Sequence, residues 1–267
     1  MIIAADAEQA RREHRRPARG GWNTAFIGAN RYTRTETDPL PDPDAVYPMA
    51  FLVEKQPGAV VRPHYHQANQ FQVVVAGGGS LGTHDVAPGA VHYTDRYSAY
   101  GPILAGEDGI AWFTLRNAWD PGARYMPADR QELRAARIRH QHREATLGAA
   151  HPMNALALAA LRAPTVATVL EQGADGLGAW RYRLPDGASV RGPDPGAGGG
   201  QYWIVFAGTA VFGGDGAPNP RANWEPGAPL GVNSCAFVSP DGAALALTAG
   251  PGGAEVLALQ FPRARPL

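Results

Sequence analysis

Short apolar runs, broken by glycine and proline, dominate the pattern of the chain from residue 47 to residue 116. Four of these runs, at residues 49–53, 70–76, 91–94 and 110–115, have the length of strands. Apolar segments of this length, bounded by turn residues, predict β-strands. The same pattern returns from residue 166 to residue 261, so the sequence predicts two β-rich regions.

The two β-rich regions are flanked by segments of a different kind. Residues 1–46 form an N-terminal arm in which the arginine-rich stretch 11–19 is solvated or partly helical, and the proline-rich run 38–44 excludes a helix or a central strand. Residues 117–165 join the two regions. A helix is predicted to begin at Pro127, because proline suits a first-turn position, and to end near His140.

An internal repeat relates the two β-rich regions. Residues 69–77 resemble residues 200–208, since in both a glutamine, Gln70 or Gln201, precedes an aromatic residue, a β-branched apolar run and Ala-Gly. The repeat period is far longer than that of a solenoid, which indicates duplication of a whole domain. The predicted fold class is therefore all-β, with two similar barrels joined by a short helical linker.

Composition narrows the classes of function. The 267 residues carry 24 basic and 24 acidic side chains, so nothing in the overall charge attracts nucleic acid or an anionic membrane. The single cysteine, Cys235, excludes a disulfide within the chain and is expected to be a buried apolar side chain. Without a signal peptide or a long apolar run, we expect a cytoplasmic protein.

The segment from Gly58 to Gln70 carries the candidate chemistry. His64 and His66 are two residues apart, so on a strand both side chains point to the same face. Gln70 begins the next strand and is placed to point back at the same spot. Two imidazoles and a third donor that converge inside a barrel suit a metal ion. A pair of histidines that are only hydrogen-bonded to their neighbours is the alternative.

This segment resembles the first motif of the cupin superfamily, G(X)5HXH(X)3,4E(X)6G. Gly58, His64, His66 and Gly77 occupy the motif positions, and Gln70 replaces the glutamate. The second motif, G(X)5PXG(X)2H, is similar to the stretch from residue 89, but all three of its distinctive residues are replaced, by Asp95, Tyr97 and Tyr100.

The resemblance implies two jelly-roll barrels, at residues 47–116 and 166–267. It also implies a divalent metal ion bound by His64, His66 and Gln70 in the first barrel. The amide of Gln70 binds a cation more weakly than a carboxylate does. At the equivalent places of the second barrel stand Pro193, Pro195 and Val238, so that half is expected to be structural.

Two further residues are candidates for a catalytic role. Tyr100 stands where cupins have the last histidine, and its ordinary pKa of about 10 favours hydrogen bonding or acid–base chemistry over a phenolate ligand. His92 lies in the strand before it, and a shift of one residue in register would turn it towards or away from the site. His84 is expected to be exposed, and His140 and His142 to lie on the surface.

Three functions follow from these expectations. The first is a metal-dependent cupin enzyme that acts on a small organic molecule, with an Fe2+ dioxygenase slightly favoured and Mn2+, Ni2+, Cu2+ or Zn2+ as other metals. The second is a binding protein without catalysis, and the third is a metal-free lyase or isomerase that uses His64, His92 and Tyr100. Fold alone does not decide among them. A homodimer, which would cover exposed strand edges, is also expected.

Overall fold

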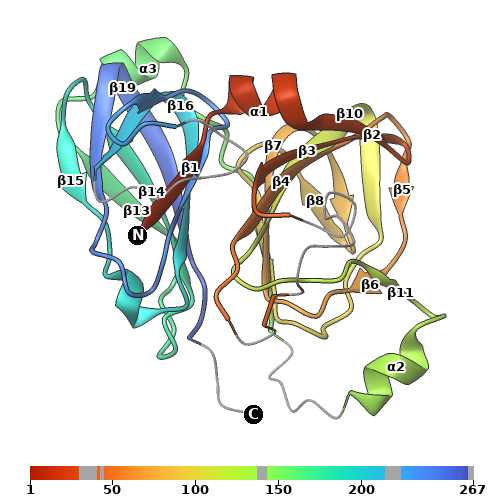
Figure 1. Ribbon diagram of the computed structural model, residues 1–267. Coiled ribbons are helices and arrows are strands. Elements are labelled where there is room, and N and C mark those ends of the chain that lie inside the picture. The colour runs from red at the N-terminus through yellow and green to blue at the C-terminus, as the bar shows by residue number, and fades with distance from the viewer. Residues whose placement is uncertain (30–40, 43–44, 137–142, 214–223, 264–267) are drawn as a thin grey trace. The chain divides into compact units, whose positions relative to one another are not determined.

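The computed structural model describes residues 1–29, 41–42, 45–136, 143–213 and 224–263 (Figure 1). The chain divides into two compact units. The first unit comprises Arg15–His151, and the second comprises Met1–His14 together with Pro152–Arg265. No described helix is long and apolar enough to cross a membrane.

The first unit is built on an antiparallel sheet in which the described strands have the order β12-β9-β7-β10-β4-β3-β2. Two short strands lie off this path, because β5 pairs with β10 and β8 pairs with β7, and β6 pairs separately with β11. The elements are β2 (Arg15–Ala18), β3 (Gly21–Ile27), β4 (Met49–Lys55), β5 (Val60–Val61), β6 (His64–Tyr65), β7 (Gln70–Leu81), β8 (His84–Val86), β9 (Val91–Thr94), β10 (Ile103–Arg116), β11 (Arg124–Tyr125), α2 (Arg130–Ala135) and β12 (Glu144–Leu147).

The second unit has a sheet with the order β1-β18-β16-β19-β14-β13, in which β15 pairs with β19 and β17 with β16. Its elements are β1 (Ile2–Ala5), α1 (Ala7–His14), α3 (Ala155–Ala159), β13 (Thr165–Leu170), β14 (Gly178–Leu184), β15 (Ser189–Arg191), a 3-10 turn (Pro195–Ala197), β16 (Gln201–Gly213), β17 (Pro229–Leu230), β18 (Cys235–Val238) and β19 (Ala246–Gln260).

The two sheets have matching topologies. From β9-β7-β10-β4-β3 in the first unit to β18-β16-β19-β14-β13 in the second, each strand has its counterpart in the same order. Gln70 begins β7 and Gln201 begins β16, so the repeat seen in the sequence occupies equivalent places. The predicted all-β fold class and the strands predicted at residues 49–53, 70–76, 91–94 and 110–115 are confirmed.

Alternation along β10 explains how one strand serves both a core and a cavity. Trp112, Thr114 and Arg116 line a cavity inside the first unit. Phe113, between them, is fully buried against Phe26 at a ring-centroid distance of 5.0 Å. Successive residues of a strand point to opposite faces, so the apolar face packs and the other face carries the site.

Large aromatic side chains are buried in the core of the second unit. Trp203 is fully buried and lies 5.2 Å from Tyr182, measured between ring centroids. Trp203 follows Gln201 by two residues, as Gln72 follows Gln70 in the first unit. The larger aromatic ring at this place packs in an apolar cluster with Val205 and Leu247.

The division of the chain differs from the predicted boundaries at residues 46 and 117. Met1–His14, which the sequence assigned to the arm, belongs to the second unit, where β1 pairs with β18. Another strand of the predicted arm, β3, pairs with β4 of the first unit. In the predicted linker, β12 pairs with β9. Pairing between strands that are distant in sequence leaves no local pattern, which explains the difference. The predicted helix is the short α2, and its predicted end near His140 lies outside the described residues.

Candidate functional site

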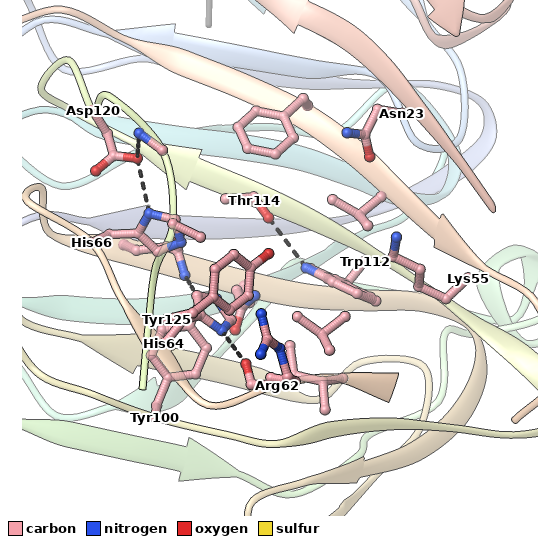
Figure 2. A pocket seen from close by; sticks show the side chains of 18 of the residues that line it. Asn23, Lys55, Arg62, His64, His66, Tyr100, Trp112, Thr114, Asp120 and Tyr125 are labelled. Carbon is pink, nitrogen blue, oxygen red and sulfur yellow. Dashed lines mark hydrogen bonds and ion pairs between the residues drawn. The ribbon is translucent and has the colours of Figure 1, made fainter. Parts of the chain in front are cut away.

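Three of the candidate residues from the sequence analysis, His64, His66 and Tyr100, lie close together inside the first unit (Figure 2). The ring centroids of His64 and His66 are 5.1 Å apart, and that of Tyr100 is 4.6 Å from His64. These three side chains and Gln70 line a cavity of about 290 Å³. His64 and Tyr100 are held side by side because their backbones pair in an isolated β-bridge.

Arg116, which the sequence analysis did not single out, lies among these candidate residues. It ends β10 directly opposite Gln70 on β7, and its side chain is almost fully buried. Its Nε and Nη2 donate to Gln70 Oε1 over 3.0 and 2.7 Å, and Nη2 lies 3.1 Å from His66 Nε2. A guanidinium therefore contacts two of the three side chains that the resemblance assigns to a metal ion.

Asp120 pairs with both the arginine and the histidine. Its Oδ2 lies 3.0 Å from Arg116 Nη1 and 2.8 Å from His66 Nδ1, and the carboxylate is fully buried. The Arg116 guanidinium, His66 and the hydrogen bond from the Gln67 backbone hold the pKa of Asp120 well below its usual value, against the effect of burial. Asp120 is therefore charged, and the Nδ1–H of His66 donates to it.

The arrangement around His66 uses both of its ring nitrogens. Arg116 Nη2 is equally close to Nδ1 and Nε2, but Nδ1 carries the hydrogen that Asp120 accepts. Nε2 is therefore the nitrogen that accepts from Arg116. Burial, and then the nearby guanidinium, lowers the pKa of His66, so the ring is neutral at neutral pH.

Gln70 and Tyr100 form a second buried hydrogen bond. Gln70 Nε2 donates to the Tyr100 hydroxyl over 2.7 Å, while Gln70 Oε1 accepts from Arg116. The amide of Gln70 thus has partners on both sides. Burial raises the pKa of Tyr100 above its usual value, which keeps the phenol protonated.

The protonation of the His64 ring follows from its hydrogen bond to the backbone. Its Nδ1 lies 2.8 Å from the backbone oxygen of Arg62, so Nδ1–H donates and Nε2 is unprotonated. Burial, followed by His66, lowers the pKa of His64 to about 3. His64 is therefore a neutral hydrogen-bond acceptor at neutral pH.

His92 lies next to this network but does not line the cavity. It is buried, its ring centroid is 5.1 Å from that of Tyr100, and its Nδ1 is 3.0 Å from Thr146 Oγ1. Burial lowers the pKa of His92 to about 3. His84 is exposed, as expected, and His140 and His142 lie outside the described residues.

The register proposed for the second motif is consistent with the backbone. Tyr97 has a φ of 59°, the left-handed conformation in which glycine is favoured, and the motif has glycine at its place. In the first motif, a Cβ on Gly77 would lie 2.2 Å from the Gly109 oxygen, so this position requires glycine. Asp95, at the proline place, forms an ion pair with Arg143.

Further cationic side chains surround the cavity. Arg19, Lys55 and Arg62 line it, and Lys55 Nζ donates to the backbone oxygen of Arg19. The guanidinium carbon of Arg62 lies 4.9 Å from the centre of the Tyr125 ring. Apolar lining is contributed by Phe51, Val53, Val61, Ile103 and Trp112. The cavity thus combines an apolar wall with an excess of positive charge.

Sequence reasoning missed Arg116, Asp120 and the cations at the cavity. A signal for Arg116 was present, because it directly follows the strand predicted at residues 110–115. Continuing the alternation of Trp112 and Thr114 by one step places it on their face. Asp120 lies beyond the end of β10, outside any regular element, and no periodicity marks it. Lys55 and Arg62 resemble ordinary surface residues at strand ends.

Comparison with solved structures identifies the fold. An 11S globulin from Wrightia tinctoria, described with an auxin binding site, matches at a TM-score of 0.58 and 12% identity, over 98% of this chain and 83% of its own. Oxalate decarboxylase from Bacillus subtilis, described with Mn(II) centres, matches at a TM-score of 0.58 and 10% identity, over 94% of this chain and 76% of its own. A bacterial pirin from Escherichia coli in complex with nickel(II) matches at a TM-score of 0.57 and 11% identity, over 99% of this chain and 100% of its own.

The chain has the fold of the cupin superfamily. Comparisons with family models and with curated proteins find no match. At identities of 10 to 12%, the likeness establishes the fold and leaves the chemistry to the residues of this chain.

The residues in this arrangement do not suit a divalent metal ion. Both nitrogens of His66 are engaged, Gln70 Oε1 accepts two hydrogen bonds, and the guanidinium of Arg116 is itself a cation. A second cation at this place would be repelled, and its ligands would first have to leave Arg116. No group of three or more His, Cys, Asp or Glu side chains in the described part of the chain is arranged to hold a metal.

Proposed function

We propose that the first unit binds a small organic anion and that it does so without a metal ion. One observation carries the proposal: the cavity is lined by four cationic side chains, Arg19, Lys55, Arg62 and Arg116, and by the single carboxylate of Asp120. Four positive charges less one negative charge leave a surplus of three. A cavity with this surplus attracts anions and disfavours a divalent cation.

The surplus positive charge lies on side chains outside the buried hydrogen-bond network around Arg116. Asp120 is neutralised by Arg116 within the network. No ion pair involves Arg19, Lys55 or Arg62 among the described residues. A ligand carboxylate would therefore be the first anion that these three side chains meet, and an arginine offers it two parallel hydrogen bonds.

The apolar lining indicates a compact ligand body. Phe51, Val53, Ile103 and Trp112 surround a volume of about 290 Å³, which suits a small aromatic or branched molecule. The proposed class is thus a small carboxylate with an apolar body. The auxin binding described for the 11S globulin is compatible with this class, although it is a property of that protein.

Binding is favoured over acid–base catalysis by the state of the candidate groups. An efficient proton-transfer group has a pKa near the working pH. Burial lowers the pKa of His64 to about 3 and raises that of Tyr100 above its usual value, so neither group matches neutral pH in the free protein. The proposed roles of Tyr100 and His92 in catalysis remain predictions.

The metal-dependent enzyme, including the Fe2+ dioxygenase, is the competing proposal that the first experiment must separate. Protein purified without a metal-affinity tag is analysed for metals and then titrated calorimetrically with benzoate in the presence of EDTA. We expect no stoichiometric metal and binding that EDTA leaves unchanged. Stoichiometric Fe, Mn, Ni, Cu or Zn that a His64→Ala/His66→Ala variant loses would contradict the proposal.

Variants of the cationic side chains test the anion site itself. Lys55→Met/Arg62→Met is expected to weaken benzoate binding by roughly tenfold or more, because each side chain contributes a charge-assisted interaction. Arg191→Met, which removes an arginine on β15 of the second unit, is the control and should leave the affinity unchanged. Equal affinities of all three proteins would contradict the assignment.

A further inference from the structure

Two carboxamides without hydrogen-bond partners line the same cavity. The side chain of Gln72 is buried, with the residue 4% exposed, and its Oε1 has no partner among the described residues. Asn23 Oδ1 is also buried without a partner there. Buried polar groups are nearly always paired in folded proteins, so each such amide requires an explanation.

The strand register places both amides on the cavity face beside its apolar wall. Gln72 pairs with Thr114 across β7 and β10. Asn23 pairs with Val53 across β3 and β4, and Val53 pairs in turn with Trp112. Gln72 is two residues from Gln70 on the same strand, hence about 7 Å along the same face.

The neighbours of Gln72 do not satisfy it. Thr114 Oγ1 accepts from Trp112 Nε1 over 3.2 Å, while Phe51 and Val53 provide no polar atom. Gln70, two residues earlier, has partners for both its oxygen and its nitrogen. The amide of Gln70 is thus satisfied within the protein, whereas that of Gln72 is available to a bound molecule.

We propose that the ligand carries a hydroxyl group, in addition to its anionic group, and that this hydroxyl binds Gln72. The inference rests on the proposed function, because it concerns the same cavity and ligand. An amide presents an oxygen acceptor and an N–H donor, and a hydroxyl both donates and accepts. A hydroxyl therefore satisfies Gln72 whichever way its amide is turned, and Asn23 is placed to bind a second polar substituent.

The test compares benzoate with 3-hydroxybenzoate and 4-hydroxybenzoate, by calorimetry in EDTA. These probes have the same carboxylate and ring, so the difference in affinity reports the hydroxyl. We expect one of the two isomers to bind roughly tenfold more tightly than benzoate to the parent protein, as for a hydrogen bond to a buried group otherwise unpaired. Gln72→Met, which keeps the length of the side chain, should abolish this preference.

Gln172→Met is the matched control, since it replaces an exposed glutamine of the second unit. It should keep the hydroxyl preference in full. Equal binding of benzoate and both isomers to the parent, or a preference that persists in Gln72→Met, would overturn the inference and leave the anion site standing. If the variant does not fold, equal binding of the three probes to the parent protein still overturns the inference. Failure of all three probes to bind would overturn the proposed function and this inference with it.

Discussion

Arg116 and Gln70 face each other at the last pair of residues joining β10 to β7, and the arginine donates two hydrogen bonds to the glutamine oxygen. The equivalent pair in the second unit is Gln260 and Gln201, where Gln201 Nε2 donates to Gln260 Oε1 over 2.7 Å. The two halves of a duplicated fold thus differ at one interior position by a permanent charge. The first unit thus has a guanidinium at the position where the second unit has an amide.

Removing the guanidinium and restoring the carboxylate should produce a metal site. In the double variant Gln70→Glu/Arg116→Ala, the introduced carboxylate joins His64 and His66 as a third donor, and Asp120 still orients His66 through Nδ1. We expect about one Co2+ or Zn2+ per chain, measured by metal analysis and by the visible absorption of bound Co2+.

The single variant Gln70→Glu is the control for this design. Its new carboxylate faces Arg116 and is expected to pair with the guanidinium, so it should bind no more metal than the parent does. Metal binding by this single variant would show that Arg116 does not exclude a cation, contrary to the site described above.

Two tyrosines in the first unit are expected to respond oppositely to loss of the hydroxyl. Tyr100→Phe leaves Gln70 Nε2 buried without an acceptor and should lower the free energy of unfolding by about 1–3 kcal/mol. Tyr65 is fully buried and its hydroxyl has no partner among the described residues, so Tyr65→Phe should leave stability unchanged or raise it. Urea unfolding of both variants measures the difference, and equal losses would contradict the hydrogen-bond assignment.

Stability should fall as the pH falls from about 6.5 towards 3. Burial lowers the pKa of His64 and His92 to about 3, whereas an unfolded histidine has a pKa of about 6.5. Between these values the unfolded chain binds more protons, so the free energy of unfolding rises with pH there and levels off above about 6.5. Each histidine contributes a slope of about 1.4 kcal/mol per pH unit within that window.

Urea unfolding at pH 5, 6 and 7 measures this slope. His92→Gln should reduce it by the share of one histidine, whereas His84→Gln, which replaces an exposed residue, should leave it as in the parent. An unchanged slope in His92→Gln would mean that His92 is not buried in its neutral form.

The thiol of Cys235 should be silent in the folded protein. The residue is fully buried in β18, and burial raises the pKa of its thiol, so the reactive thiolate is both scarce and inaccessible. We expect no labelling by a thiol reagent in buffer and one equivalent per chain in denaturant. Rapid labelling of the native protein would indicate that the edge of the second sheet opens readily.

Much of the fold could be predicted from local patterns. Strand length, glycine and proline punctuation and the shared Gln-aromatic run all act within a few residues, and they located β7 and β16 at equivalent places. The H-x-H spacing also brought His64 and His66 together correctly, because alternation along an extended chain fixes their common face.

The rest depends on contacts between distant parts of the chain. Asp120, which contacts His66, lies in a segment without regular structure. The two residues are far apart in sequence, so no local pattern predicts that they pair. The family motif predicted a metal ion. A motif specifies the ligand positions, but it does not specify which other side chain lies between the ligands. Arg116 supplies a cation there, because the pairing of β10 with β7 sets it opposite Gln70.

The pairing of β1 with β18 ties the first described strand to one of the last. Ile2 cannot pair with Val238 until residue 238 has been synthesised. In contrast, β9 and its partner β12 are close in sequence and can pair soon after both leave the ribosome. Synthesis therefore favours an order in which the first unit folds while the second still lacks its partner strands. A fragment that starts at Pro152 would lack β1, exposing the edge of β18 to other chains and inviting aggregation.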